Sequence, residues 1–437
     1  NYANLQKYTE VRKLIALAIP NFAQNYKTHS DNSQSNLDFM IIEGKHCCAN
    51  IFTDNIEDAA IDWVKTQCDH PAFDGAMIVQ MPDVHAGHSC NVGTAYRIGE
   101  YVNPDHIGTD IGCTVSMHRL SAPVDAKDFA LLDHRIREAI PMGAGICTQN
   151  SLNEKELFRF LNSYYQKARS AAPDSINEIP RIDARFISDL CRRIRLQEGM
   201  FYKSIGSLGG GNHFVEYGEE DDKTPWLTIH TGSRNLGVKV ASHWHSIANA
   251  PKHRDMPGFL CGDALNGYLS DMVIAQAYAC YNHETIRDRI FAILKRLCKA
   301  KCDESIVTPH NYVDVIDKRP ILRKGSINAS EGLKVGIPLN MRDGTAICIG
   351  KGNEQWLNTA PHGAGRALSR TQAKKQIDID EFKRSMDGIF STSVCAGTLD
   401  ESPQAYKPAD EILSLISPTV SVLTIVRPKL NIKDRGK

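Results

Sequence analysis

The alternation of hydrophobic and polar positions predicts a chain that mixes strands with helices. Short apolar and β-branched runs predict strands at Ala76–Met81, Val92–Arg97, Thr114–Leu120, Phe214–Tyr217, Trp226–Ile229, Ala346–Ile349 and Val420–Val426. Apolar residues three and four positions apart predict helices at Leu5–Ala18, Leu131–Ala139, Glu154–Ala168, Ala184–Arg195 and Ala264–Lys301. We expect an α+β fold, in which residues 1–437 form one large mixed α/β domain with a helical insertion at about 125–203 in a β-rich body.

Composition excludes several classes of protein. Hydrophobic and charged residues make up 42% and 23% of the 437 residues, which is typical of a soluble globular chain. No apolar run reaches the roughly 18 residues that span a membrane. The 51 basic and 51 acidic residues balance, which argues against a protein that coats nucleic acid non-specifically. We find no secretion signal, and the 13 cysteines are scattered, so we expect the cytosol, with the nucleus as the alternative.

A histidine lies among glycines in the segment Ala360-Pro361-His362-Gly363-Ala364-Gly365-Arg366. The glycines allow the backbone to approach a phosphate closely. We expect a helix to begin just after Gly365, so that its free N–H groups face an anion. A neutral imidazole can attack an α-phosphate, and the chain has neither a P-loop nor a Lys-x-Asp-Gly segment that would supply a lysine nucleophile. The alternative is a glycine-rich turn around a buried histidine.

Five further side chains are candidate metal ligands. Asp110 and Cys113 are three residues apart, and His213, His230 and His310 add imidazoles from separate segments. A carboxylate, a thiolate and three imidazoles suit Mn²⁺, Fe²⁺, Co²⁺ or Zn²⁺ better than Mg²⁺ or Ca²⁺. Five ligands exceed the needs of one tetrahedral ion, and a bridging thiolate would allow two ions. Taken singly, each histidine has the alternative of a packed or surface position.

These candidates lie in a set of segments that together resemble one protein family. The segments are Gly108-Thr109-Asp110-Ile111-Gly112-Cys113, Gly209-Gly210-Gly211-Asn212-His213-Phe214-Val215-Glu216, His230-Thr231-Gly232-Ser233-Arg234, Pro309-His310-Asn311, Arg323-Lys324-Gly325 and the segment of His362. From about Met81 to the C-terminus the chain resembles the RtcB family of RNA ligases. The resemblance implies a β-rich layered core, GTP and two Mn²⁺ ions as cofactors, a bridging role for Cys113, and a covalent His362–GMP intermediate.

The resemblance also implies further site residues. Nucleotide contacts are expected from Asn212, Glu216, Tyr406 and Lys433. Contacts to RNA phosphates are expected from Arg234, Asn311, Lys324 and Arg366. Asp83 and His85 match a segment near the active site and are expected to support the reacting groups. The segment Asn340–Gly344 departs from the glycine-serine segment of the family, and His118 and Arg119 are unexpectedly polar for a buried strand.

The expected function follows from the same resemblance. It is an RNA ligase that joins 2′,3′-cyclic phosphate or 3′-phosphate ends to 5′-hydroxyl ends, through His362–GMP and guanylylation of the RNA 3′ end. The partner is therefore RNA with such ends, and an archease-type activator is a second candidate partner. One alternative is a dinuclear metal-dependent RNA phosphoesterase without sealing activity. Another is a binding protein that has kept the fold and lost catalysis, although no ligand is missing.

Overall fold

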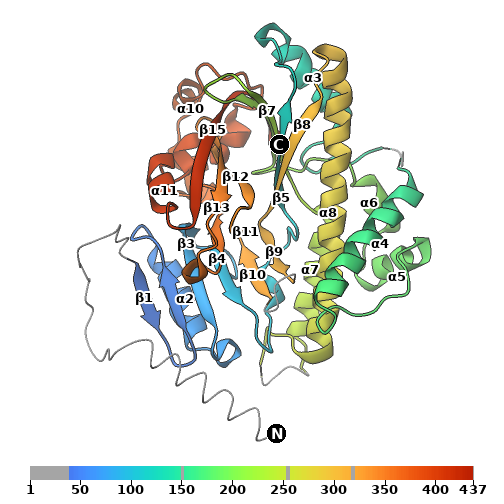
Figure 1. The fold of residues 1–437 in the computed structure, drawn as a ribbon, viewed down its shortest axis with the longest axis vertical. Coiled ribbons are helices and arrows are strands. Elements are labelled where there is room, and N and C mark those ends of the chain that lie inside the picture. The colour runs from blue at the N-terminus through green and yellow to red at the C-terminus, as the bar shows by residue number, and fades with distance from the viewer. Residues whose placement is uncertain (1–38, 149–151, 252–255, 316–319, 437) are drawn as a thin grey trace, which may run out of the picture. The chain divides into compact units, whose positions relative to one another are not determined.

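Two extended sheets, one small sheet and a set of flanking helices make up the described part of the chain (Figure 1). The computed structural model describes residues 39–148, 152–251, 256–315 and 320–436. From Phe39 onward the chain is one compact unit. The expected α+β class is confirmed. The helix predicted at Leu5–Ala18 lies outside the described residues, so the inclusion of residues 1–38 in a single domain stays a prediction.

The first sheet has the strand order β1-β2-β3-β4-β10-β9. Its strands are β1 Met40–Glu43, β2 Cys48–Ile51, β3 Met77–His85, β4 Val92–Arg97, β9 Asn311–Asp314 and β10 Ile321–Lys324. The strand predicted at Ala76–Met81 is longer than expected, because β3 continues through Pro82 to His85. The pairing of β3 with β4 shifts between Gln80 and His85, so no regular ladder bond is required of a proline there. Asp83 therefore lies on a strand of the first sheet.

The second sheet has the order β12-β13-β15-β6-β7-β5-β8. Its strands are β5 Thr114–Leu120, β6 Phe214–Glu219, β7 Pro225–Thr231, β8 Cys302–Pro309, β12 Lys334–Asn340, β13 Gly344–Gly350 and β15 Val420–Ile432. On β6 and β15 one set of alternating residues, Val215, Tyr217, Leu430 and Ile432, belongs to a buried apolar cluster. The residues between them therefore point to the opposite face of the sheet.

A two-stranded sheet, β11 Ser326–Asn328 with β14 Thr359–Pro361, carries the next functional segment. Ser326 pairs with Pro361 in an antiparallel register. Gly325 precedes β11 and His362 follows β14, so this pairing brings the Arg323-Lys324-Gly325 segment beside His362. Gly325 also follows directly on β10, so the small sheet connects the end of the first sheet to the segment of His362.

Helices flank the sheets. They are α2 Asp58–Cys68, α3 Phe129–Ala139, α4 Glu154–Ala171, α5 Ala184–Arg193, α6 Glu198–Lys203, α7 Arg234–Ala248, α8 Gly262–Leu297, α9 Arg370–Gln376, α10 Ile379–Ser385 and α11 Ala409–Leu415. The long helix α8 packs against β5 and β7 (Figure 1). It was expected to reach Lys301, but it ends at Leu297, and Lys299 has a left-handed backbone (φ 61°). The predicted helices at Leu131–Ala139, Glu154–Ala168 and Ala184–Arg195 correspond to α3, α4 and α5.

The prediction of a helix directly after Gly365 is wrong. The N–H groups of Ala367 and Leu368 both donate to the Ala405 carbonyl, and Arg366 forms a β-bridge with Tyr406. Helix α9 begins only at Arg370, where Ser369 and Gln372 form a capping box. The segment after His362 is therefore pinned against residues 405–406, and no free helix N-terminus follows the histidine directly.

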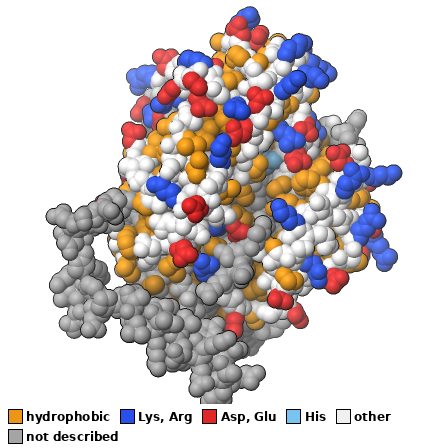
Figure 2. All heavy atoms as spheres, viewed as in Figure 1, with side chains coloured by type: hydrophobic (Ala, Val, Ile, Leu, Met, Phe, Trp, Pro, Cys, Tyr) orange, Lys and Arg blue, Asp and Glu red, His pale blue; other side chains and the backbone are white. Residues whose placement is uncertain are grey.

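The surface shows no segregation of charge on the face in Figure 2, where acidic and basic side chains are interspersed. This distribution agrees with the balanced composition of 51 basic and 51 acidic residues. Within the described ranges, no helix combines the length and apolar character needed to cross a membrane.

Candidate active site

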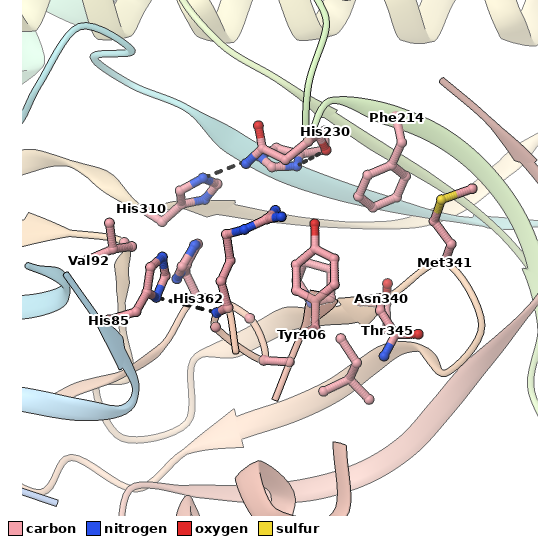
Figure 3. A pocket seen from close by; sticks show the side chains of 18 of the residues that line it. His85, Val92, Phe214, His230, His310, Asn340, Met341, Thr345, His362 and Tyr406 are labelled. Atoms are coloured by element: carbon pink, nitrogen blue, oxygen red, sulfur yellow. Dashed lines mark hydrogen bonds between the residues drawn. The ribbon is translucent and has the colours of Figure 1, made fainter. Parts of the chain in front are cut away.

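A cavity of about 300 Å³ lies where the edges of the three sheets meet. Figure 3 shows His310, His362 and His85 at one end of it, and Phe214, Tyr406 and Met341 toward the other. We call these the histidine end and, because the resemblance places the nucleotide contacts there, the base end. The lining residues come from β3, β4, β6, β7, β9, β10, β12, β13 and β15, from the start of α9, and from loops that include the segment after β14.

The five predicted metal ligands converge through the strand order of the second sheet. Cys113 precedes β5 and His213 precedes β6, whereas His230 lies near the end of β7 and His310 follows β8. Because β5 is antiparallel to β7 and β8, and β6 is antiparallel to β7, these four positions lie at the same edge of the sheet. The register pairs Phe214 directly with His230. The ligand set is thus brought together by topology from positions up to 200 residues apart (310 − 110).

The ligand atoms face one another at short distances. Cys113 Sγ lies 3.4 Å from His213 Nε2 and 3.2 Å from His230 Nε2. His230 Nε2 lies 3.3 Å from His310 Nε2, and the fifth candidate, Asp110, has Oδ2 3.0 Å from His213 Nε2. The cluster of Cys113, His213 and His230 is buried.

The tautomers of two histidines show that this cluster fits a cation. His213 Nδ1–H donates to the Leu208 carbonyl (2.9 Å), and His230 Nδ1–H donates to the Asn212 carbonyl (3.0 Å). In the neutral form of each ring, Nε2 therefore carries the lone pair, and both lone pairs face the Cys113 sulfur. Lone pairs facing a sulfur and a carboxylate are unfavourable unless a cation or protons lie between them. The softness of the donors suits a transition metal.

The pKa shifts describe the same cluster in electrostatic terms. Burial lowers the pKa of His230 and of His310 well below the usual value, and neighbouring imidazoles lower both further. Burial also raises the pKa of the Cys113 thiol, with the Asp110 charge adding to the rise. For Asp110 burial acts to raise the pKa, but the hydrogen bond and charge of His213 outweigh it and the pKa is lowered. Burial thus holds the His230 and His310 imidazoles neutral, as metal ligands must be.

His362, at the histidine end of the cavity, is held by a buried carboxylate. Its Nδ1–H donates to Asp83 Oδ2 at 2.7 Å, and Asp83 is fully buried on β3. Nε2 is therefore the ring nitrogen that carries the lone pair. The His362 ring centroid is 5.1 Å from that of His310, which puts the nucleophile candidate beside the ligand cluster.

Glycines allow this close packing around His362. Gly365 has a positive φ of 73°, and a Cβ there would lie 2.2 Å from the Asp83 carbonyl oxygen. A Cβ on Gly325 would lie 3.1 Å from His362 Cε1. The glycines that the sequence pattern singled out thus serve a close approach between strands as well as access to the cavity.

The base end is built on the face of β6 and β15 opposite the apolar cluster. Phe214 and Glu216 alternate with buried core residues on β6, and Asn431 stands directly opposite Glu216 on β15. Asn431 Nδ2–H donates to Glu216 Oε2 at 2.8 Å. Lys433, just beyond the end of β15, lies with its Nζ 5.8 Å from the centre of the Phe214 ring. Burial raises the pKa of Glu216 to about 8, although Asn431 and Lys433 act to lower it.

A buried carboxylate organises the cations of the base end. Glu401 accepts from Lys433 Nζ (2.8 Å) and from the Tyr406 hydroxyl (2.8 Å), and Arg366 and Arg370 also pair with it. Burial acts to raise the pKa of Glu401, but the charges of Lys433 and Arg370 outweigh it and lower the pKa to about 2. The Arg366 guanidinium lies over the Tyr406 ring, 5.1 Å from its centre. This end is thus a network of satisfied charges.

Comparison with known proteins identifies the family. The model of the family described as tRNA-splicing ligase RtcB matches residues 68–434. The chain belongs to the RtcB family. It is 27% identical to the RNA-splicing ligase RtcB of Escherichia coli (strain K12) over 389 residues, which cover 82% of this chain and 90% of that protein. It is 28% identical to the tRNA-splicing ligase RtcB of Nanoarchaeum equitans over 402 residues, 77% of this chain and 83% of that protein.

The RNA-contact candidates of this RtcB-family chain fall into two groups. Asn311, Lys324 and Arg366 line the cavity. Lys324 Nζ–H donates to the Ile107 carbonyl (2.9 Å), and Asn311 Oδ1 accepts from the Gly325 N–H (2.9 Å). Arg234 does not line the cavity but lies behind the ligand cluster, donating to the Gly143 carbonyl (2.8 Å). The donors of Arg366 are engaged by Leu368, Asp400 and Glu401.

The remaining predicted residues of the RtcB set also lie at the cavity. Asn212 and His85 line it, and burial lowers the pKa of His85 to about 4. The sequence reasoning did not assign several other residues that line or support it, namely Phe214, Met341, Thr345, Arg370, Glu401 and Asn431. Phe214 directly follows His213 in the Gly209–Glu216 motif, and Met341 belongs to the segment Asn340–Gly344, which departs from the family pattern. Asn431 is two residues before Lys433, so strand periodicity carried a signal for it.

Proposed function

We propose that this protein is an RNA ligase that joins 2′,3′-cyclic phosphate or 3′-phosphate ends to 5′-hydroxyl ends with the energy of GTP. The observation that carries the proposal is the position of His362. Its imidazole is fixed by Asp83 through Nδ1, next to a converging ligand cluster, and it lines a cavity that also carries polar and aromatic side chains. The curated relatives named above are RNA-splicing and tRNA-splicing ligases, which supports RNA as the substrate.

In the proposed first step, His362 Nε2 attacks the α-phosphorus of GTP. A P–N bond forms to the histidine while the bond to pyrophosphate breaks, so pyrophosphate leaves with its electron pair. The product histidine carries positive charge, and the Asp83 carboxylate stabilises it through the Nδ1–H bond. Tyr406 and Phe214 pack near the base, and Lys433 and Glu216 contact its edge.

In the later steps the GMP moves from the histidine to RNA. A 2′,3′-cyclic phosphate end is first hydrolysed: water adds to the phosphorus, the bond to the 2′-oxygen breaks, and a 3′-phosphate and a 2′-hydroxyl result. An oxygen of the RNA 3′-phosphate then attacks the phosphorus of His362–GMP, which restores the free imidazole and leaves a 3′-guanylylated end. The 5′-hydroxyl of the second strand then attacks the 3′-phosphorus, and GMP leaves. Asn311 and Lys324 are the cavity residues proposed to hold RNA phosphates in these steps.

Two Mn²⁺ ions are proposed as the resident metals. Asp110, Cys113, His213, His230 and His310 would hold them, and their donor atoms fit such ions because they are neutral nitrogens, a thiolate and a carboxylate. When bound, the ions would neutralise charge on the triphosphate and the leaving group. An archease-type activator stays a prediction, which addition of such a protein to the reaction would test.

The first test is intact mass after incubation with GTP and Mn²⁺. We expect a gain of one GMP with GTP, no gain with ATP, and no gain for His362→Ala. His245→Ala is a matched control, since this histidine is half-exposed and pairs with Asp105 away from the cavity. A joining assay on RNA with 2′,3′-cyclic phosphate and 5′-hydroxyl ends follows. If His362→Ala still opens or cleaves RNA ends at the wild-type rate, and the wild type never joins them, the phosphoesterase alternative replaces ligation.

A further inference from the structure

Two buried acceptor atoms at the base end lack partners. Asn431 Nδ2 is spent on Glu216 Oε2, and this leaves Asn431 Oδ1 and Glu216 Oε1. Both atoms are buried, and neither has a hydrogen-bond partner among the described residues. Both residues line the cavity. Because an unpaired buried acceptor is unfavourable, two of them side by side on facing strands indicate donors supplied by a ligand.

The backbone explains why these acceptors are adjacent. Asn431 and Glu216 are direct partners in the antiparallel pairing of β15 with β6, so their side chains stand on the same face of the sheet. Lys433, two residues further along, puts an ammonium on that face as well. The polar edge of the cavity therefore offers one donor and two acceptors, while Phe214 and Tyr406 supply aromatic surfaces nearby (Figure 3).

We propose that Asn431 is a specificity residue that accepts a hydrogen bond through Oδ1 from the 2-amino group of a bound guanine. This inference rests on the proposed function, which makes GTP the substrate. On its Watson–Crick edge guanine presents one acceptor, O6, and two neighbouring donors, N1–H and the 2-amino group. Lys433, Glu216 and Asn431 match these in type. Adenine has no 2-amino group and presents an acceptor at N1, which would face the acceptors of Glu216 and Asn431.

A second interpretation gives Asn431 a different task. In it, Asn431 only holds the Glu216 carboxyl through Nδ2, and the base does not touch the amide. The two interpretations differ for inosine triphosphate, which keeps O6 and N1–H and lacks only the 2-amino group. Loss of a carboxyl support weakens both nucleotides equally, whereas loss of a 2-amino contact weakens GTP alone.

The experiment compares guanylylation, as kcat/KM for His362–GMP or His362–IMP formation, with GTP and ITP in the presence of Mn²⁺. For the wild type we expect GTP to be favoured about tenfold or more, since ITP leaves a buried acceptor unpaired. Asn431→Leu and Asn431→Ala should remove the preference for GTP over ITP. Both nucleotides weaken because Glu216 loses the Asn431 donor, and GTP weakens further because it also loses the 2-amino contact. Glu216→Gln is the matched variant, and it should weaken both nucleotides because both carry N1–H.

Three outcomes would overturn the assignment. Equal losses for GTP and ITP in both Asn431 variants would show that the residue only supports Glu216. A collapse of the preference in Thr345→Val, whose hydroxyl is also buried without a partner at this cavity, would move the 2-amino contact to Thr345. A metal-loaded wild type that forms no adduct with either nucleotide would overturn the proposed function, and this inference with it.

A measurement on the wild type alone covers the case in which the Asn431 variants fold poorly. GTP, ITP and 7-deaza-GTP are compared as substrates of the unmodified protein. Since no residue is proposed to contact N7, 7-deaza-GTP should match GTP, and only ITP should fall. Equal use of GTP and ITP by the wild type contradicts the proposal without any variant.

Discussion

At the histidine end of the cavity, imidazole nitrogens face one another and a sulfur, whereas at the base end the cations are paired with the buried carboxylate of Glu401. The His230 and His310 Nε2 atoms are 3.3 Å apart and held neutral by burial. Glu401, in contrast, is paired with Lys433, Arg366 and Arg370. A bound cation would relieve the crowding of ligand atoms at the histidine end, whereas the protein itself supplies the counter-charge at the base end. Variants at the two ends should therefore fail in different ways.

The largest expected effect comes from breaking the histidine end. His230→Ala removes the imidazole that lies between the Cys113 sulfur and His310, so bound Mn²⁺ should be lost from the protein. Guanylylation should fall by about 1000-fold or more, since the metal supplies several kcal/mol of charge stabilisation. Metal content by elemental analysis and adduct formation are measured together. A variant that keeps its metal and loses activity would contradict the proposed ligand role.

A second large effect is expected at His362, beside the ligand cluster. Asp83→Asn keeps the size of the residue that accepts from His362 Nδ1 but removes the charge that stabilises a phosphorylated histidine. We expect adduct formation to slow by about 100-fold or more, by analogy with the loss of the carboxylate that orients a catalytic histidine. Metal content should remain at the wild-type level, which separates this variant from His230→Ala. Unchanged adduct kinetics would assign Asp83 a purely structural role.

The same contrast explains how far the sequence could predict the site. Cys113, His213, His230 and His310 carry their chemistry in their residue types and in glycine-rich motifs, so they were visible before any fold was known. Their convergence follows from one sheet edge, which strand patterns alone do not specify. The fold class, the helices α3, α4, α5 and α8 and several strands followed from apolar periodicity, because an amphipathic segment such as α4 has one clear apolar stripe.

The base end was harder to predict because it depends on pairings between distant strands. Asn431 gains its role from its register opposite Glu216, and Glu401 from three cations on other segments. A lone asparagine or glutamate in a sequence carries no such signal. The helix expected after Gly365 failed for a related reason, because a tertiary contact with Ala405 took the N–H groups that helix propensity had assigned.

A smaller effect is expected from breaking the charge network of the base end. Glu401→Gln leaves Lys433 and Arg366 without their buried counter-charge, which should destabilise the fold by about 3 kcal/mol. Glu304→Gln is the control, because its pair with Lys334 is partly exposed and should contribute little.

The pKa of Glu401 is lowered to about 2, so its stabilisation is fully present above the ordinary value of 4.5 and is lost as pH falls toward 2. The difference in unfolding free energy between wild type and Glu401→Gln should shrink accordingly, and a difference independent of pH in that window would contradict the ion network.

The smallest effect sharpens the comparison through pH. Burial raises the pKa of Glu216 to about 8, so below pH 8 most of the free protein carries a protonated carboxyl. Acceptance of a hydrogen bond from guanine N1–H favours the ionised form, and binding therefore releases a proton. GTP affinity should rise by up to about tenfold per pH unit between pH 6.5 and 8 and level off above pH 8. It is measured in the His362→Ala background, where no adduct forms. Adding Glu216→Gln to this background removes the titrating carboxyl, so the rise of GTP affinity with pH should disappear. An identical pH slope with and without Glu216→Gln would show that Glu216 does not titrate on binding.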